Sequence, residues 1–507
     1  MISLPILSVV TVTPLVGALV VASIPSKYPD AIRRTALAFA LVAWVMSLGL
    51  LAAFAFGPVG FQFIEAHSWI GNFGIQYKVG IDGLSVLMLV LTTTLTWISI
   101  LASFGPIKDR VKGYMICFLI LEVGMIGVFI ALDLFLFYIF WEIVLVPMYL
   151  IIGIWGGANR IYATMKFVLY TLVGSLLMLV AILATAFAYQ VAHGGSWAGA
   201  FDYQGLLAFA GSGGFGQNLQ LIAFLALFLA FAIKVPMFPF HTWLPDAHTE
   251  APTAGSVILA GVLLKLGAYG LIRFAVPLYP YAAHTFAGPI IVLSIIAIVY
   301  GAIVSIVQTD LKRLVAYSSV SHMGFVTLGI FVFNATAYQG AVLQMINHGL
   351  ITGGLFLLVG VLYERTHDRT IAKMGGVAAL MPIYATIFGF FILASAGLPG
   401  LAGFVGEFLV FVGSFQAAPI YAAATIIVMV LGATYLLWMF QRVAFGTLSE
   451  FLTGLGSHLT DISRTEMLTL MPLAILVVVL GLFPSLVLDL LRSPAQDFLN
   501  AAAAVGH

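Results

Sequence analysis

Seven ionisable residues lie near the middle of long apolar segments, far from any membrane–water interface. Five are formally charged and two are histidines: Glu122, Glu142, Lys234, Lys265, Glu407, His322 and His348. An ionisable group at mid-bilayer is costly unless it is paired or hydrated, so such groups are rare and usually functional. Acids, bases and neutral imidazoles at similar depth can pass a proton from one to the next. We interpret the set as a candidate proton relay.

Each of these residues also has a structural explanation. A buried Glu142–Lys234 pair could simply tie two helices together. A lone histidine such as His322 or His348 can serve as a hydrogen-bonding strut, and Glu122 could bond to a neighbouring hydroxyl. Their number favours transport, because isolated struts would not be expected to alternate acids, bases and neutral relays within one bundle.

Other kinds of site have weaker support in the sequence. His241 and Asp246 lie at the inner end of an interrupted apolar segment, and we interpret them as part of an inner proton entrance. A metal site at His241 and His248 would have looser ligand spacing than is usual, and Cys117 is the only cysteine. The glycine-rich stretch at 211–216 has no preceding strand, so it does not fit a phosphate loop. We expect no metal, no bound cofactor and no redox chemistry on this chain.

The amino-acid composition indicates whether these residues lie in a water-soluble protein or in a membrane protein. Of 507 residues, 62% are hydrophobic and only 8% are charged. A water-soluble globular protein carries about 25% charged residues. The net charge of +1 provides no basic patch for nucleic acid. The chain is therefore predicted to be an all-α membrane protein.

A membrane-spanning helix needs about 20 mostly apolar residues. On that rule we predict about fourteen spans, at 4–22, 34–56, 82–104, 114–132, 134–154, 163–190, 217–238, 252–275, 286–306, 314–333, 337–361, 380–413, 419–440 and 467–490.

The distribution of cations predicts the orientation. Only Lys78, Arg273 and Arg492 fall in one set of alternate loops and helix ends. Fourteen fall in the other set: Lys27, Arg33, Arg34, Lys108, Arg110, Lys112, Arg160, Lys312, Arg313, Arg365, Arg369, Lys373, Arg442 and Arg464. Cytoplasmic loops carry the excess of Lys and Arg. We expect both termini on the periplasmic side of a bacterial cytoplasmic membrane, in preference to a mitochondrial inner membrane.

Two predicted spans are interrupted. The seventh contains Pro236 and Pro239, and the twelfth is too long for one crossing and contains Gly397-Leu-Pro399-Gly400. The breaks lie five helices apart, an odd number, so a second copy would be inverted relative to the first, a recurring transporter architecture. We predict flanking helices 1–3 (1–113), a first five-helix repeat (114–275), a second inverted repeat (286–440), and an inner loop with helix 14 (441–507).

Four segments resemble the antiporter-like subunits of NADH:quinone oxidoreductase (respiratory complex I) and of multisubunit Na⁺/H⁺ antiporters. They are Phe140-Trp-Glu142 through Pro147, Phe231 through Gly267 with its Lys234-Val-Pro236 and His241-Thr-Trp-Leu-Pro-Asp246 stretches, Asp310 through Gly324, and Gly397 through Glu407. At position 407 this chain has a glutamate, which resembles the M branch (mitochondrial subunit 4) of the family. The L and N branches and the antiporters typically have a lysine at this position.

The resemblance implies that the chain translocates protons in the membrane arm and is driven by redox energy released elsewhere in the complex. It assigns Glu142, Lys234, Lys265 and Glu407 to a central relay and His322 and His348 to its connections. NAD, FMN, iron–sulfur clusters and quinone are expected on other subunits. Implied partners are the L and N subunits, the lateral helix of L, and lipids. The alternatives are a cation/proton antiporter subunit, a solute symporter and a non-pumping scaffold.

Overall fold

The structure of the chain is a computed structural model that describes residues 5–504. Its first third contains α1 (Ile6–Ser23), α2 (Pro29–Ala55), β1 (Gln62–Ile70), the turn η1 (Gly71–Phe73), β2 (Ile75–Ile81), α3 (Gly83–Ala102), α4 (Val111–Ile130), α5 (Leu134–Trp155) and α6 (Arg160–Ala192). The middle contains α7 (Tyr203–Gly211), α8 (Gln217–Lys234), α9 (Trp243–Glu250), α10 (Thr253–Ile258), η2 (Leu259–Leu263), α11 (Leu264–Gly270), η3 (Leu271–Ala275), α12 (Val276–Leu278), α13 (Pro280–Ile306), α14 (Leu311–Phe331) and α15 (Ala335–Thr366).

The last third contains η4 (Ile371–Lys373), η5 (Val377–Ala379), α16 (Pro382–Ser395), α17 (Ala402–Ala417), α18 (Pro419–Thr425), α19 (Ile427–Ala444), α20 (Glu450–Leu455), η6 (Gly456–His458), α21 (Arg464–Leu482), α22 (Ser485–Leu488) and α23 (Arg492–Ala503). Within the described residues, 13 helices are long and apolar enough to cross a membrane. Each overlaps one predicted span. The remaining prediction, 380–413, corresponds to the two shorter helices α16 and α17. The all-α membrane fold is confirmed.

Both predicted interruptions are present. Helix α8 ends at Lys234, and the chain turns through Pro236 and Pro239 before α9 begins at Trp243. Helix α16 ends at Ser395 and α17 begins at Ala402, with Gly397 and Gly400 at φ +80° and +93° between them. Only glycine adopts such backbone angles without steric cost. Lys234 is the last residue before the first interruption, and Glu407 is the sixth residue of the helix that follows the second.

A third irregularity has no proline signal. The segment Thr253–Leu278 is one membrane-length helix by composition, but two π-helical segments, η2 and η3, interrupt it on either side of α11. Single π turns occur often at functional sites. Lys265 is the second residue after the first π segment, and Arg273 lies within the second.

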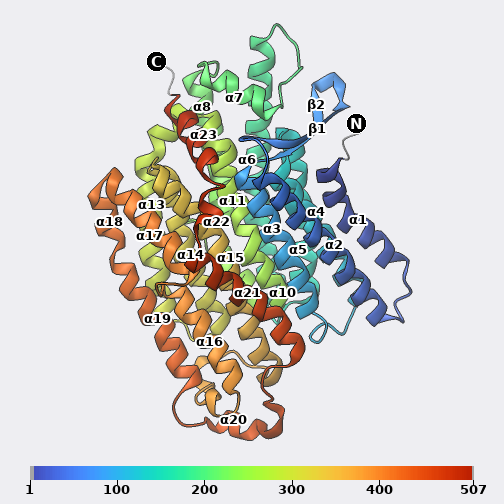
Figure 1. Cartoon of the computed structure of the whole chain (residues 1–507), viewed down its shortest axis with the longest axis vertical. Coiled ribbons are helices and arrows are strands. Elements are labelled where there is room, and N and C mark those ends of the chain that lie inside the picture. The colour runs from blue at the N-terminus through green and yellow to red at the C-terminus, as the bar shows by residue number, and fades with distance from the viewer. Residues whose placement is uncertain (1–4, 505–507) are drawn as a thin grey trace.

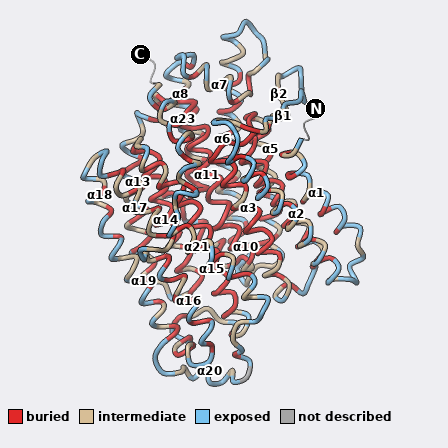
Figure 2. Tube along the Cα trace, viewed as in Figure 1, coloured by how far each residue is buried: buried red, intermediate tan, exposed pale blue. Residues whose placement is uncertain are grey.

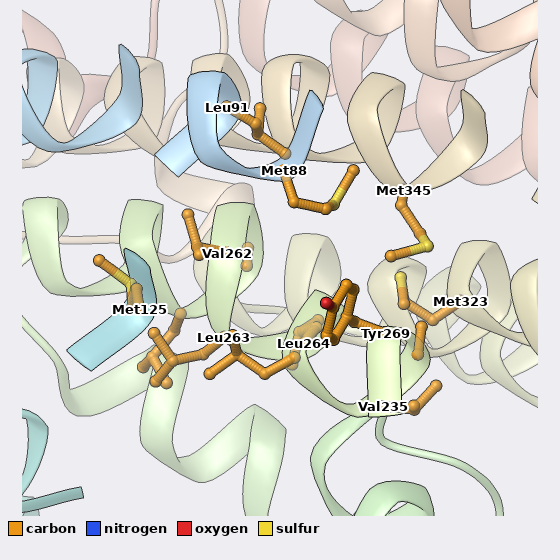
Figure 3. Packing of buried hydrophobic residues seen from close by; sticks show 14 of the residues in the cluster. Met88, Leu91, Met125, Val235, Val262, Leu263, Leu264, Tyr269, Met323 and Met345 are labelled. Carbon is orange, nitrogen blue, oxygen red and sulfur yellow. The ribbon is translucent and has the colours of Figure 1, made fainter. Parts of the chain in front are cut away.

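Helices differ sharply in how much of their surface the protein itself covers. The central parts of the segment Thr253–Leu278 and of α15 are completely buried, whereas α1, α2, α19 and α21 remain largely exposed at the periphery. Figure 2 shows the buried trace concentrated along the centre of the bundle. Figure 3 shows its packing, with Met88, Met323, Met345 and Tyr269 meeting between central helices. Ionisable groups on these central helices therefore face protein rather than lipid.

Most of the short elements outside the membrane-length helices lie at one end of the bundle. The antiparallel β1–β2 hairpin, α7 and α23 lie at that end, as does the start of α1, and α20 lies at the other (Figure 1). The chain termini, predicted to be periplasmic, lie outside the described residues. Aspartates cap the helices that start here: Asp82 for α3, Asp133 for α5 and Asp202 for α7 each accept backbone N–H bonds. We call this the hairpin end.

Replacing Gly403 by alanine should destabilise the second interruption. Gly403 lies at the start of α17, where an added methyl would overlap the carbonyl oxygen of Ala394 in α16. Forcing these backbones apart should lower the free energy of unfolding by about 1–3 kcal/mol and displace Glu407 one turn further on. The thermal midpoint of the purified protein measures this. Gly432→Ala on α19, where no atom lies within 4 Å of the new methyl, is the control and should change nothing.

Candidate functional site

The centre of the site is a direct contact between two of the predicted residues. Lys265 Nζ lies 2.7 Å from His348 Nδ1, and both side chains are buried, the lysine completely. The lysine also donates to the carbonyl of Ala260, which lies within the π segment η2. The irregular helix thus supplies a backbone acceptor that holds the ammonium toward α15.

The row continues from α15 to the second interruption. The rings of His348 and His322 have centroids 6.0 Å apart, and His322 Nδ1 lies 2.5 Å from Glu407 Oε1. Gln344 donates to the same carboxylate oxygen at 2.9 Å. A small cavity lies between the two histidines and is lined by both of them, Gln344, Glu407 and Ser395. Lys265, His348, His322 and Glu407 therefore form one connected row.

Glu407 borders a larger cavity of about 160 Å³ on the far side of His322. Its lining includes the Tyr435 side chain, which lies 3.4 Å from His322 Nε2, as does the Ser395 hydroxyl. Its remaining walls are mostly apolar and come from α14, α17, α18 and α19. This end of the row is thus the part closest to the periphery of the bundle.

The first pair of the predicted relay is held apart in this structure. Lys234 is buried at the end of α8, with its ammonium 5.1 Å from the ring centroid of Trp141 and 5.8 Å from that of Phe167. Glu142 is half-buried on α5, and no ion pair joins it to Lys234 within the described residues. Its Oε1 atom is buried and has no hydrogen-bond partner among residues 5–504. The lysine ammonium lies against aromatic faces, which favour a buried cation.

The proposed entrance residues lie near α9 with different partners. Asp246 pairs with Lys166 at 2.7 Å and with Arg313 at 3.8 Å. The His241 ring packs between Phe238 and Tyr300, and neither ring nitrogen has a hydrogen-bond partner in the described part of the chain. Asp246 therefore already neutralises cations of α6 and α14. The ring nitrogens of His241, by contrast, are available for a hydrogen bond.

Glu122 stands apart from the row. It is completely buried on α4, and neither carboxylate oxygen has a partner among residues 5–504. The sequence-based alternative of a bond to a neighbouring hydroxyl is therefore wrong in this structure. A buried polar group without a partner is costly, so this carboxyl group is either neutral or hydrated.

Three buried polar groups near the row were not predicted from the sequence to belong to it. His248 is completely buried, stacks on Phe356 with centroids 4.7 Å apart, and has two unpartnered ring nitrogens within the described residues. Lys312, assigned from sequence to an inner loop, is buried and donates to the Ala251 carbonyl at 2.5 Å. Gln344 is the third. The position of His248 two residues before Glu250 on a short helix gave no signal of burial.

The sequence of this chain is similar to those of known membrane-protein subunits. The family model described as "NADH:quinone oxidoreductase/Mrp antiporter, TM" matches residues 131–433. NADH-quinone oxidoreductase subunit M of Rhodobacter capsulatus is 48% identical over 493 residues, covering 96% of this chain and 94% of that protein. The chain belongs to this family.

Solved structures agree with the fold. One chain of the respiratory complex I from Thermus thermophilus with bound NADH matches with a TM-score of 0.87 and 31% identity, covering 99% of this chain and 100% of that one. A chain of the Mrp complex from Dietzia sp. DQ12-45-1b has a TM-score of 0.83 but only 19% identity, so it supports the fold alone. The predicted resemblance to subunit M is confirmed.

Proposed function

We propose that this chain translocates protons across the membrane as the M subunit of an NADH:quinone oxidoreductase, through the row Lys265, His348, His322 and Glu407. The observation that carries the proposal is the buried Lys265–His348 contact of 2.7 Å, which connects the two halves of the bundle. Proton transfer needs donor and acceptor within hydrogen-bond reach or one water apart. Membership in the family, with subunit M relatives, supports the same activity.

Energy for the transfer comes from an electrostatic switch at Glu142 and Lys234. At an effective dielectric near 20, two unit charges about 4 Å apart attract by roughly 4 kcal/mol. Moving one charge against about 180 mV costs roughly the same, at about 2.3 kcal/mol per 100 mV. The free energy of forming or breaking this pair is therefore similar to the free energy needed to pump one proton. The separated arrangement in the structure corresponds to the open state of the switch.

Protons enter from the inner side near His241 and Asp246 and reach Lys265 when Glu142 leaves Lys234. They then pass to His348, cross the small cavity to His322 by a bound water, and reach Glu407 for release outward. A water can bridge polar groups too far apart for a direct bond. The hairpin end is the periplasmic side, consistent with the excess of cations in the opposite loops.

The surroundings of the chain follow from membership in the complex. It is a multi-pass subunit whose neighbours are other membrane-arm subunits, and we propose the L and N antiporter-like subunits and the lateral helix of L among them. NAD, FMN, iron–sulfur clusters and quinone lie on other subunits, so redox energy reaches this chain through conformational or electrostatic coupling. The membrane is a bacterial cytoplasmic membrane.

A cation/proton antiporter subunit is the second candidate. Its support is the shared fold with the Mrp complex. Glutamate at 407 and the higher identity to the complex I chains favour the first.

Replacing Glu142 by alanine tests the proposal. Without the carboxylate the switch cannot close on Lys234, so NADH-driven proton pumping should fall about tenfold or more, which needs only about 1.4 kcal/mol of the roughly 4 kcal/mol that the pair is worth. Coupled quinone reduction should slow. Pumping is measured in proteoliposomes with a pH-sensitive dye, and assembly by the NADH rate with an artificial acceptor. Glu142→Asp keeps the charge and should retain substantial pumping.

An assembled Glu142→Ala complex that pumps normally would refute the switch. Pumping that instead requires a sodium gradient would favour the antiporter.

A further inference from the structure

A second buried ionic cluster lies two helical turns from Lys265, toward the hairpin end. Arg273 Nη2 donates to Asp82 Oδ2 at 2.6 Å, and its Nε donates to the hydroxyl of Tyr269 at 3.2 Å. The Ser85 hydroxyl lies 3.1 Å from the same tyrosine oxygen. Arg273 and Asp82 are 7% and 6% exposed, and Tyr269 and Ser85 are completely buried. The relay described above uses none of these four residues.

On its outer side this cluster borders a cavity of about 650 Å³. Five charged residues line the cavity, three acidic and two basic: Asp82, Asp489, Asp497, Arg273 and Arg492. Helix α23 and the segment before it form one wall, and Asp489 and Arg492 are well exposed. The lining is mostly apolar, but its charged groups carry one net negative charge, so the cavity is a weakly acidic vestibule that favours cations and protons.

The distance from this vestibule to the relay is short. Lys265, Tyr269 and Arg273 are spaced four residues apart, so they follow one face of the segment that contains α11 and η3. An open path along this face would let protons from the acidic vestibule reach Lys265 directly. It would bypass His348, His322 and Glu407 and dissipate the gradient.

The hydrogen bonds around Tyr269 argue that the path is closed. Its hydroxyl donates to the Phe129 carbonyl at 2.9 Å, and a carbonyl has no proton to pass on. Lys265 directs its ammonium to Ala260 and His348, away from Tyr269. The Tyr269 ring lies among buried apolar side chains, including Met323 and Met345 (Figure 3). No polar group thus joins Tyr269 to Lys265 in the described residues.

Arginine is suited to such a position because its guanidinium stays protonated and cannot relay a proton. A fixed positive charge beside a pore also repels protons and cations. Asp82 holds the guanidinium in place, and the faces of Phe61, Tyr203 and Tyr269 surround it at 5.0, 5.8 and 5.3 Å from their ring centroids.

We infer that Arg273, held by Asp82 and backed by Tyr269, is an electrostatic seal that separates the outer vestibule from Lys265 and prevents protons from flowing back. The inference rests on the proposed proton relay, because a seal has a purpose only if Lys265 carries protons.

The test compares passive proton entry into proteoliposomes that contain the whole complex. The double variant Arg273→Gln/Asp82→Asn removes both charges, keeps hydrogen-bonding groups, and leaves no buried charge unpaired. With a potential imposed and no NADH present, an enclosed pH-sensitive dye should report proton entry about tenfold faster than in the native complex, the effect of lowering a barrier by about 1.4 kcal/mol. During turnover, NADH oxidation should continue while net acidification falls.

Two controls isolate the charge. Arg273→Lys keeps the positive charge and should remain tight. Lys78→Gln/Asp202→Asn removes another ion pair of the hairpin end, 2.5 Å long, that does not border the vestibule, and it should also remain tight.

A tight double variant that pumps normally would overturn the inference and leave the cluster a structural tie between α3 and η3. A tight double variant in which pumping and NADH oxidation fall together would also overturn it, because the cluster would then be an outlet. Both results leave the relay intact, whereas failure of the relay itself would appear as normal pumping by Glu142 or Lys265 variants.

Discussion

Replacement of Lys265 by methionine is expected to reduce NADH-driven proton pumping about a hundredfold, the lower range for loss of a positioned acid–base group. Lys265 is completely buried and is the group through which the lysine side of the bundle contacts His348. Methionine has a similar shape and fills the same space, so packing around α11 should be preserved. A loss of pumping would therefore be caused by removal of the ammonium group and not by a change in the fold.

The measurement is the initial rate of dye quenching per NADH oxidised in proteoliposomes, with complex content set by the artificial-acceptor rate. Lys373→Met is the matched control, since that lysine is half-exposed and pairs with Asp368 at the surface, where ion pairs contribute little. It should pump normally. Normal pumping by Lys265→Met would remove the central step of the proposed path.

Some features of this arrangement could be predicted because they have a physical cause that is visible in the local sequence. Apolar length located the spans, and proline and glycine located both interruptions, because these residues act on their own backbone. Mid-span position identified Lys265, His322, His348 and Glu407, which the structure brings into one row. These predictions succeeded because burying a charge in an apolar segment is costly enough to be visible in a single sequence.

Other features depend on neighbours distant in the chain, and the sequence alone did not contain them. Nothing in Leu259–Leu263 signals a π segment, since its residues suit an ordinary helix. Lys312 follows an aspartate helix cap and resembles a loop cation, yet it is buried against Ala251. Glu142 and Lys234 form no ion pair among the described residues, and the lysine lies against Trp141 and Phe167 instead, neighbours that its sequence position did not indicate. The residue roles stay predictions until variants are measured.

Glu407→Gln should block the outward end of the path with an effect close to that of Lys265→Met. Glutamine can keep the hydrogen bonds that Gln344 and His322 make with Oε1, so α17 should stay in place. An amide cannot accept and release a proton at this position, so protons that reach His322 would have no exit, and pumping should fall about a hundredfold. The same dye assay measures it.

The companion variants separate chemistry from packing at this site. Glu407→Ala also removes the hydrogen bonds and should pump no better than Glu407→Gln, while Glu407→Asp keeps an acid on a shorter arm and should recover part of the rate. Because Arg273 would still seal the vestibule, none of the three should admit protons passively. Normal pumping by Glu407→Gln would place the exit elsewhere, and a passive leak would mean that Glu407, rather than Arg273, closes the outer side.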